Sequence, residues 1–229
     1  MTVEAVTYIS DLNASYPAAG DSLVEGDDHI RNLKTGIKAT FPNLTGPVTA
    51  TQTTLSNVGL VFISSASASA SATIDFTSGI DATYDEYELH IINAVPATGT
   101  AIPWLRTTAD GSTWPSSAGD YDWTCTDNGA ATNGSTTAAR IEIGPGVSND
   151  TAIGGFSAVA RIYKPSGTTH NKRIDICGSI GGSTAKGNIH VTHASGMRSA
   201  TAAITGVRFM FSTGNITSGL FRLYGVKTS

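Results

Sequence analysis

The feature that most constrains the fold is a series of short segments with alternating apolar and polar residues, which begins near residue 61 and continues to the last ten residues. In Glu86 to Val95, Tyr87, Leu89 and Ile91 share one face, because successive side chains of a strand point to opposite sides. Further segments are Ala138 to Ile143, Phe156 to Tyr163, Arg173 to Ile180, Ile189 to Val191, Val207 to Phe211 and Leu220 to Val226. Turn residues separate them and no helical period intervenes, which predicts an all-β domain.

The stretches between these segments are rich in Gly, Ser, Asn and Pro, and they cover 109–120, 127–136 and 144–155. We expect them to form loops at the ends of the domain. Charged residues make up only 14% of the chain, which suits a β protein with many turns and a hydroxyl-rich surface. No clean internal repeat is present, which disfavours a solenoid. The sequence predicts a mainly β chain in which residues 61–229 form an antiparallel β-sandwich, jelly-roll-like in topology.

Residues 22–41 differ from the rest and predict a short helix. Ser22 and Glu25 have the spacing of a capping box, and Pro42 ends the helical pattern. Apolar residues recur at the a and d positions of a short heptad pattern: Leu23, Ile30, Leu33 and Ile37. Residues 1–60 are therefore expected to form an N-terminal segment with this helix and a Thr-rich linker from 43 to 60.

The helix needs a packing partner, since a lone helix of this length is marginal in water. Gly26 and Gly36 each weaken it by about 1 kcal/mol relative to alanine. One interpretation is packing on the β domain of its own chain. The other is a self-associating bundle, most simply a homotrimer, because isoleucine at a positions favours more than two strands. The pattern leaves both open. Residues 1–20 are expected to be extended and to dock on some other surface, since they cannot form a core alone.

Charge and motifs argue against several functions. The net charge is −4 and the basic residues do not cluster, which argues against nucleic-acid binding. No apolar run approaches the roughly 18 residues of a membrane span. The N-terminus lacks the pattern of a signal peptide, so we expect folding in a cytoplasm. Cys125 and Cys177 match no zinc or redox spacing and are interpreted as free thiols, with a disulfide between them left open.

No nucleophile elbow, phosphate loop or dinucleotide motif is present, so we expect no enzymatic activity, no catalytic residue and no cofactor. His190 and His193 lie three apart on a predicted strand and point to opposite faces, which makes a metal site unfavourable. Aromatic residues near loops are better candidates for binding, because their rings stack on sugars. We predict ligand contacts at Trp114, Asp120 and Tyr121, and packing of Trp104 and Trp123 in the core or between subunits.

Two segments resemble bacteriophage fibre proteins. Residues 6–51 resemble the N-terminal segment of many phage tail-fibre and related virion proteins, most specifically in GDDHIRNLKTGIKATFPNLTG. The β domain resembles the C-terminal domain of phage fibres, near its start in TYDEYELHIINAVPAT and at its end in STGNITSGLFRLYG. Together the two segments cover most of the chain.

The resemblance implies a virion protein that assembles in the host cytoplasm, forms a homotrimer and is held in the particle by other virion proteins. Attachment would then fall on Asp27, Asp28, His29 and Arg31 of the specific stretch. The outward-facing head would bind a host receptor, expected to be a surface polysaccharide. Because almost no shaft separates the two parts, the alternative is a capsid fibre or decoration protein without a receptor role.

Overall fold

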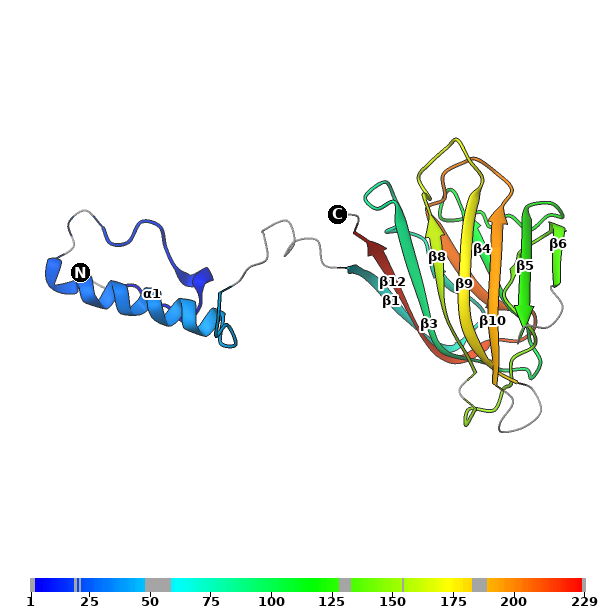
Figure 1. Cartoon of the computed structure of the whole chain (residues 1–229), viewed down its shortest axis with the longest axis horizontal. Coiled ribbons are helices and arrows are strands. Elements are labelled where there is room, and N and C mark those ends of the chain that lie inside the picture. Colours follow the sequence, from blue (N-terminus) through cyan, green and yellow to red (C-terminus); the bar gives the residue numbers. More distant parts are fainter. Residues whose placement is uncertain are drawn as a thin grey trace. The chain divides into compact units, whose positions relative to one another are not determined.

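The computed structural model describes residues 3–18, 20, 22–47, 59–127, 133–153, 155–182 and 189–227 (Figure 1). The chain divides into two units, residues 1–52 and 53–229. It is mainly β, with antiparallel sheets and one short α-helix, so the predicted fold class is confirmed. Most of the predicted linker, 43–60, lies outside the described residues.

The N-terminal unit contains two 3₁₀ turns, η1 (Ile9–Asp11) and η2 (Leu23–Glu25), and the helix α1 (Gly26–Thr40). The predicted capping box is wrong, because the 3₁₀ turn ends at Glu25 and Ser22 directly precedes it. The Ser22 hydroxyl accepts the Val24 N–H at 3.2 Å, and Glu25 precedes α1 without a side-chain cap. At the other end Phe41 N–H donates to the Ile37 carbonyl and α1 stops before Pro42, as predicted.

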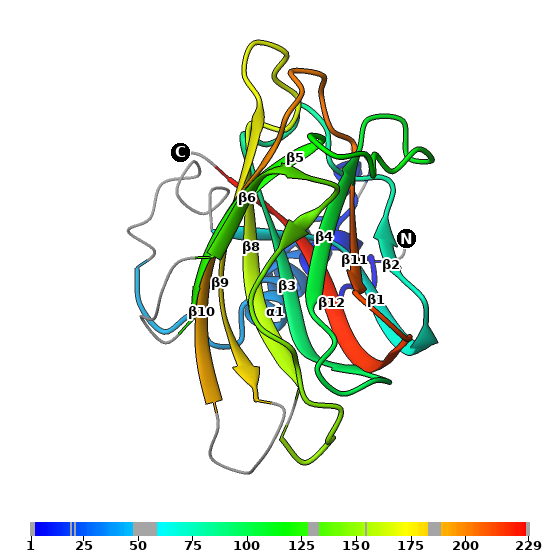
Figure 2. The same cartoon turned by 90° about the vertical axis from the view of Figure 1, so that its right-hand side faces the viewer.

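The second unit contains twelve strands. In chain order they are β1 (Leu60–Ser71), β2 (Ile74–Phe76), β3 (Glu86–Pro96), β4 (Pro103–Thr108), β5 (Tyr121–Asp127), β6 (Asn133–Ala138), β7 (Ile141–Glu142), β8 (Phe156–Tyr163), β9 (Lys172–Gly181), β10 (Ile189–Arg198), β11 (Gly206–Phe211) and β12 (Ile216–Val226). They form an eight-stranded sheet, β1-β12-β3-β8-β9-β10-β5-β6, and a four-stranded sheet, β2-β11-β4-β7. Figure 2 shows the smaller sheet in front of the larger one.

The pairing follows one nested scheme. β1 pairs with β12, β2 with β11, β3 with β8 and β4 with β7, and successive pairs alternate between the two sheets. A long antiparallel ribbon wrapped in this way is a jelly roll. Two further strand pairs, β5–β6 and β9–β10, are inserted into the scheme, and β10 pairs with β5. Together these insertions widen the larger sheet.

The core lies between the two sheets and is built by the alternation read from the sequence. Tyr87, Leu89 and Ile91 are buried on the inner face of β3, as predicted. Phe209 of the small sheet stacks near Phe156 of the large one, with ring centroids 6.0 Å apart. The outer face of the large sheet carries charged side chains such as Glu86 and Arg161 beside exposed apolar ones such as Val191. The loops and this face are the accessible surfaces of the jelly roll.

Candidate functional site

The N-terminal unit is held together by contacts between α1 and an arm formed by residues 3–17. The Asn32 side chain donates to the Glu4 carbonyl at 2.5 Å, and Ile9 N–H donates to the Thr40 hydroxyl at 2.8 Å. Gly36 is buried at this contact, where an added Cβ would lie 2.8 Å from Val6 Cγ1. The arm therefore docks on the helix of its own unit, and Gly36 permits its close approach.

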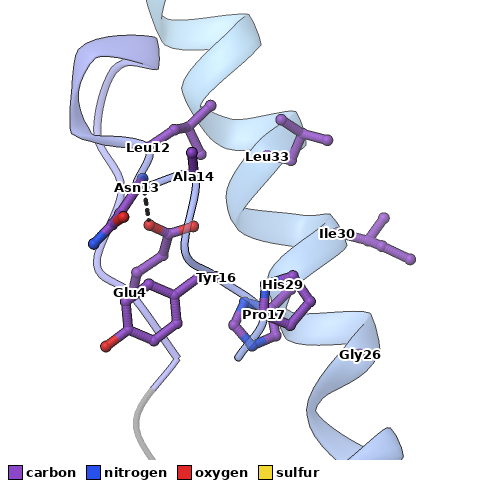
Figure 3. Close-up of a pocket in the computed structure, with 10 residues that line it drawn as sticks. All are labelled: Glu4, Leu12, Asn13, Ala14, Tyr16, Pro17, Gly26, His29, Ile30 and Leu33. Atoms are coloured by element: carbon purple, nitrogen blue, oxygen red, sulfur yellow. Dashed lines mark hydrogen bonds between the residues drawn. The ribbon is translucent and has the colours of Figure 1, made fainter. Parts of the chain in front are cut away.

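A groove of about 570 Å³ lies between the arm and α1 (Figure 3). On its arm side the Glu4 carboxylate accepts the Asn13 N–H at 2.9 Å. The Tyr16 ring stacks on His29 of the helix, with ring centroids 6.2 Å apart. Ile30 and Leu33 line the groove and project outward from α1.

The predicted helix seam forms an exposed apolar stripe. Its members follow one another at three or four residues and therefore share one helix face: Ile30, Leu33 and Ile37. Their side chains are 54%, 45% and 45% exposed. The arm thus covers a neighbouring face of α1, while the stripe borders the groove and stays about half exposed. The side chain of the fourth predicted member, Leu23, lies outside what the structure describes.

The four predicted attachment residues separate into two groups. Arg31 bridges Asp27 at 2.5 Å and Asp28 at 2.6 Å, and all three side chains are at least half exposed. His29 instead faces the groove beside Tyr16. Exposed ion pairs contribute little to stability, typically about 0–1 kcal/mol. The Asp27–Asp28–Arg31 group therefore contributes little to the stability of α1 and is accessible at its surface.

The predicted receptor contact at Tyr121 is wrong. Its side chain is fully buried at the start of β5, where the hydroxyl accepts the Thr107 N–H at 2.9 Å. The sequence DYDW placed this residue beside a loop but did not reveal that the strand begins there with an inward-facing ring.

Trp114 and Asp120 lie at the surface but are already engaged. The Arg208 guanidinium covers the Trp114 ring at 4.3 Å from its centroid, and Arg208 is itself held by Asp75 through two hydrogen bonds. Asp120 accepts the Ser117 N–H at 2.7 Å and pairs with Arg198 at 3.0 Å. Of the other tryptophans, Trp123 packs against the core, and Trp104 is half-buried beneath Arg140. The three predicted contacts therefore do not form one binding site.

The outer face of the large sheet carries a polar network that the sequence analysis missed. Glu88 is buried on this face, between His90 at 2.8 Å and Arg161 at 2.6 Å, and Arg161 also pairs with Glu86 at 2.6 Å. Burial raises the pKa of Glu88, but the hydrogen bonds from His90 and Arg161 outweigh it and lower the pKa below its ordinary value. The alternation of Glu86, Glu88 and His90 in the sequence indicates that these side chains share one face of a strand. Arg161 could not be added to them from the sequence, because it lies on another strand.

Cys125 and Cys177 are free thiols, and burial raises the pKa of Cys125. His190 binds the Asp127 carboxylate at 2.8 Å, and the described ranges contain no cluster of three metal-ligating side chains.

Within those ranges no helix is long and apolar enough to cross a membrane.

A scan of protein-family models, a search of curated proteins and a search of solved structures gave no match. Among the described residues, the candidate functional surfaces are the stripe of α1 with its groove and the outer face of the large sheet of the jelly roll.

Proposed function

We propose that this chain is a structural fibre protein of a bacteriophage particle. In this proposal the N-terminal unit trimerises and attaches the protein to other virion proteins. The jelly-roll unit is the head and binds a host surface glycan. The observation that carries the proposal is the exposed stripe of Ile30, Leu33 and Ile37 on a helix whose neighbouring face already packs on the arm.

The stripe supports self-association on energetic grounds. Complete burial of one leucine or isoleucine side chain contributes about 1.5–3 kcal/mol, and three such side chains per chain are about half exposed. A bundle of three helices would bury them around one axis, with isoleucine at two of the a positions. The ion group of Asp27, Asp28 and Arg31 would remain on the outside of the bundle, available to a particle protein.

The jelly roll supports the role of a head. This fold occurs in viral capsid and lectin domains, although the fold by itself does not determine function. In a trimer, weak glycan sites on three heads act together and raise the overall affinity without any new contact. The resemblance of residues 83–98 and 212–225 to phage fibre domains points in the same direction.

Incorporation into particles tests the proposal. A chain lacking residues 1–45 should keep a folded β domain, measured by circular dichroism, and should be absent from purified particles of a phage that carries the gene. The full chain, expressed in parallel, should be present. Incorporation of the truncated chain at the level of the full chain would refute the attachment role of the N-terminal unit.

A further inference from the structure

A hollow of about 590 Å³ lies at one end of the jelly roll, where the outer face of the large sheet meets two loops. The sheet supplies Tyr163 at the end of β8, Arg173 on β9 and Met197 on β10. Arg173 and Met197 are direct cross-strand partners. Alternation explains why the guanidinium faces outward, since the neighbouring Lys172 and Ile174 are buried on the inner side.

The walls come from the β8–β9 loop, 164–171, and the β10–β11 loop, 199–205, which rise side by side at the top of both views (Figure 1, Figure 2). The buried ammonium of Lys172 joins these loops, because it donates to the His170 carbonyl at 2.7 Å and to the Thr201 carbonyl at 2.9 Å. Ile204 N–H also donates to the Pro165 carbonyl at 3.0 Å. A hollow fixed in this way loses little conformational entropy when a ligand binds.

The hollow is lined by basic side chains and by no acidic one among the described residues. Lys164 pairs loosely with Asp85 at 3.5 Å, while Arg173 makes no ion pair within the described part of the chain. Asp175, on the same sheet face, accepts the Ser195 hydroxyl at 2.7 Å. Arg173 therefore keeps its full hydrogen-bonding capacity, as Arg222 does on the same sheet, but Arg173 lines the hollow, where its guanidinium suits a planar or tetrahedral anion.

The remaining lining groups have the chemistry of sugar recognition. Tyr163 contributes an aromatic ring, while its hydroxyl already interacts with Arg161 and Asp175. Thr169 and Thr201 contribute hydroxyls, and Asn171 contributes an amide. Met197 adds an apolar contact. An anion-binding group beside several hydrogen-bonding groups and an aromatic ring matches a sugar that carries an acidic substituent.

We infer that this hollow binds an acidic saccharide. The Arg173 guanidinium pairs with the carboxylate or phosphate of the sugar, and Tyr163, Asn171 and Thr201 contact its ring and hydroxyl groups. The inference rests on the proposed function of the head as a glycan-binding domain and specifies both the place and the charge of the ligand. Particle incorporation depends on the N-terminal unit and uses no ligand, so the two proposals fail independently.

Titration calorimetry of the full chain tests the inference with three probes: a hyaluronan tetrasaccharide, glucose 6-phosphate and maltotetraose. We expect one site per chain for at least one acidic probe, with a dissociation constant on the order of 1 mM or below, and no measurable binding of neutral maltotetraose. The two acidic probes distinguish a carboxylate ligand from a phosphate ligand.

Arg173→Gln should weaken binding of the acidic probe by about 10- to 100-fold, as expected for loss of a charge-assisted hydrogen bond. Arg222→Gln is the matched control, because Arg222 is exposed on β12 of the same sheet and lies outside the hollow. Thermal unfolding of both variants checks that each is folded. Equal weakening by the two substitutions, equal binding of maltotetraose, or no binding of either acidic probe at 10-fold above the expected dissociation constant would overturn the inference.

Discussion

At the residue scale, the described part of the jelly roll contains two buried charged groups, and the structure shows the hydrogen-bond partners of each. Glu88 lies beneath the outer face of the large sheet and is held by His90 and Arg161. Lys172 lies at the loop end and is held by two backbone carbonyls. Removing one partner of such a group leaves the other buried without compensation, so substitutions here have larger effects than at exposed charges.

The first prediction concerns the pH dependence at Glu88. Its pKa is lower in the folded state than its ordinary value of 4.5, so its contribution to stability is present above pH 4.5 and is lost as the pH falls through the folded value. We expect Glu88→Gln to cost roughly 1–3 kcal/mol of unfolding free energy at neutral pH. The difference from the wild type should shrink in acid, as measured by urea unfolding across pH.

Asp85→Asn is the control for this prediction, since its carboxylate is exposed and pairs with Lys164 at 3.5 Å. It should change the unfolding free energy by less than about 0.5 kcal/mol. A Glu88→Gln effect that is the same at neutral and acid pH would contradict the assigned role of the Glu88 charge.

The second prediction concerns Lys172. Lys172→Met removes the ammonium that joins the His170 and Thr201 carbonyls, and burial already lowers the pKa of this lysine. Amide hydrogen exchange should accelerate by about 10-fold in residues 164–171 and 199–205 and remain unchanged in β3, because local opening becomes easier. Lys164→Met makes the same chemical change at an exposed position of one loop and should leave the exchange of 199–205 unaltered. Unchanged exchange in Lys172→Met would show that other contacts hold the loops.

At the element scale, α1 presents one face to the arm and another to solvent. Its two glycines lie in different surroundings. An added Cβ at Gly26 meets no atom within 4 Å, whereas at Gly36 it meets Val6 Cγ1 at 2.8 Å. Gly26→Ala should therefore stabilise the helix by up to about 1 kcal/mol, and Gly36→Ala should fall short of this gain. Gly36→Ala should also loosen the arm, measured as faster proteolysis within residues 3–17. Equal stabilisation by both substitutions with an equally protected arm would contradict the packing at Gly36.

The exposed stripe gives the fourth prediction. Leu33→Glu places a charge in the seam and should abolish the trimer at micromolar concentration, measured by sedimentation velocity, because burial of an unpaired carboxylate is unfavourable. Thr35→Glu introduces the same side chain at an exposed position opposite the seam and should leave the assembly intact. An assembly that tolerates Leu33→Glu would not use this seam.

Periodicity within an element was the part of the structure that the sequence predicted well. The alternation in residues 156–163 corresponds to β8, and Pro42 marked the end of α1. Features that depend on geometry between elements were missed. Ser22 and Glu25 have the spacing of a capping box, but a 3₁₀ turn ends at Glu25 instead. The Tyr121 side chain is buried because it faces the core between the two sheets.

At the scale of the whole chain, the surfaces with functional potential arise from segments that are far apart in the sequence. The hollow around Arg173 combines three strands and two loops, and the buried position of Glu88 depends on Arg161, 73 residues away. No local pattern predicts such a combination, because the pairing of inserted strands β9–β10 with β8 and β5 decides it. The N-terminal unit differs, since its seam and ion group lie within one helix and were visible in the sequence.

The molar mass of the full chain in solution tests the proposed assembly most directly. Size-exclusion chromatography with multi-angle light scattering should give three times the chain mass of 23.6 kDa at micromolar concentration. A single species at 23.6 kDa would mean that the stripe of Ile30, Leu33 and Ile37 does not mediate trimerisation, and it would contradict the proposed fibre.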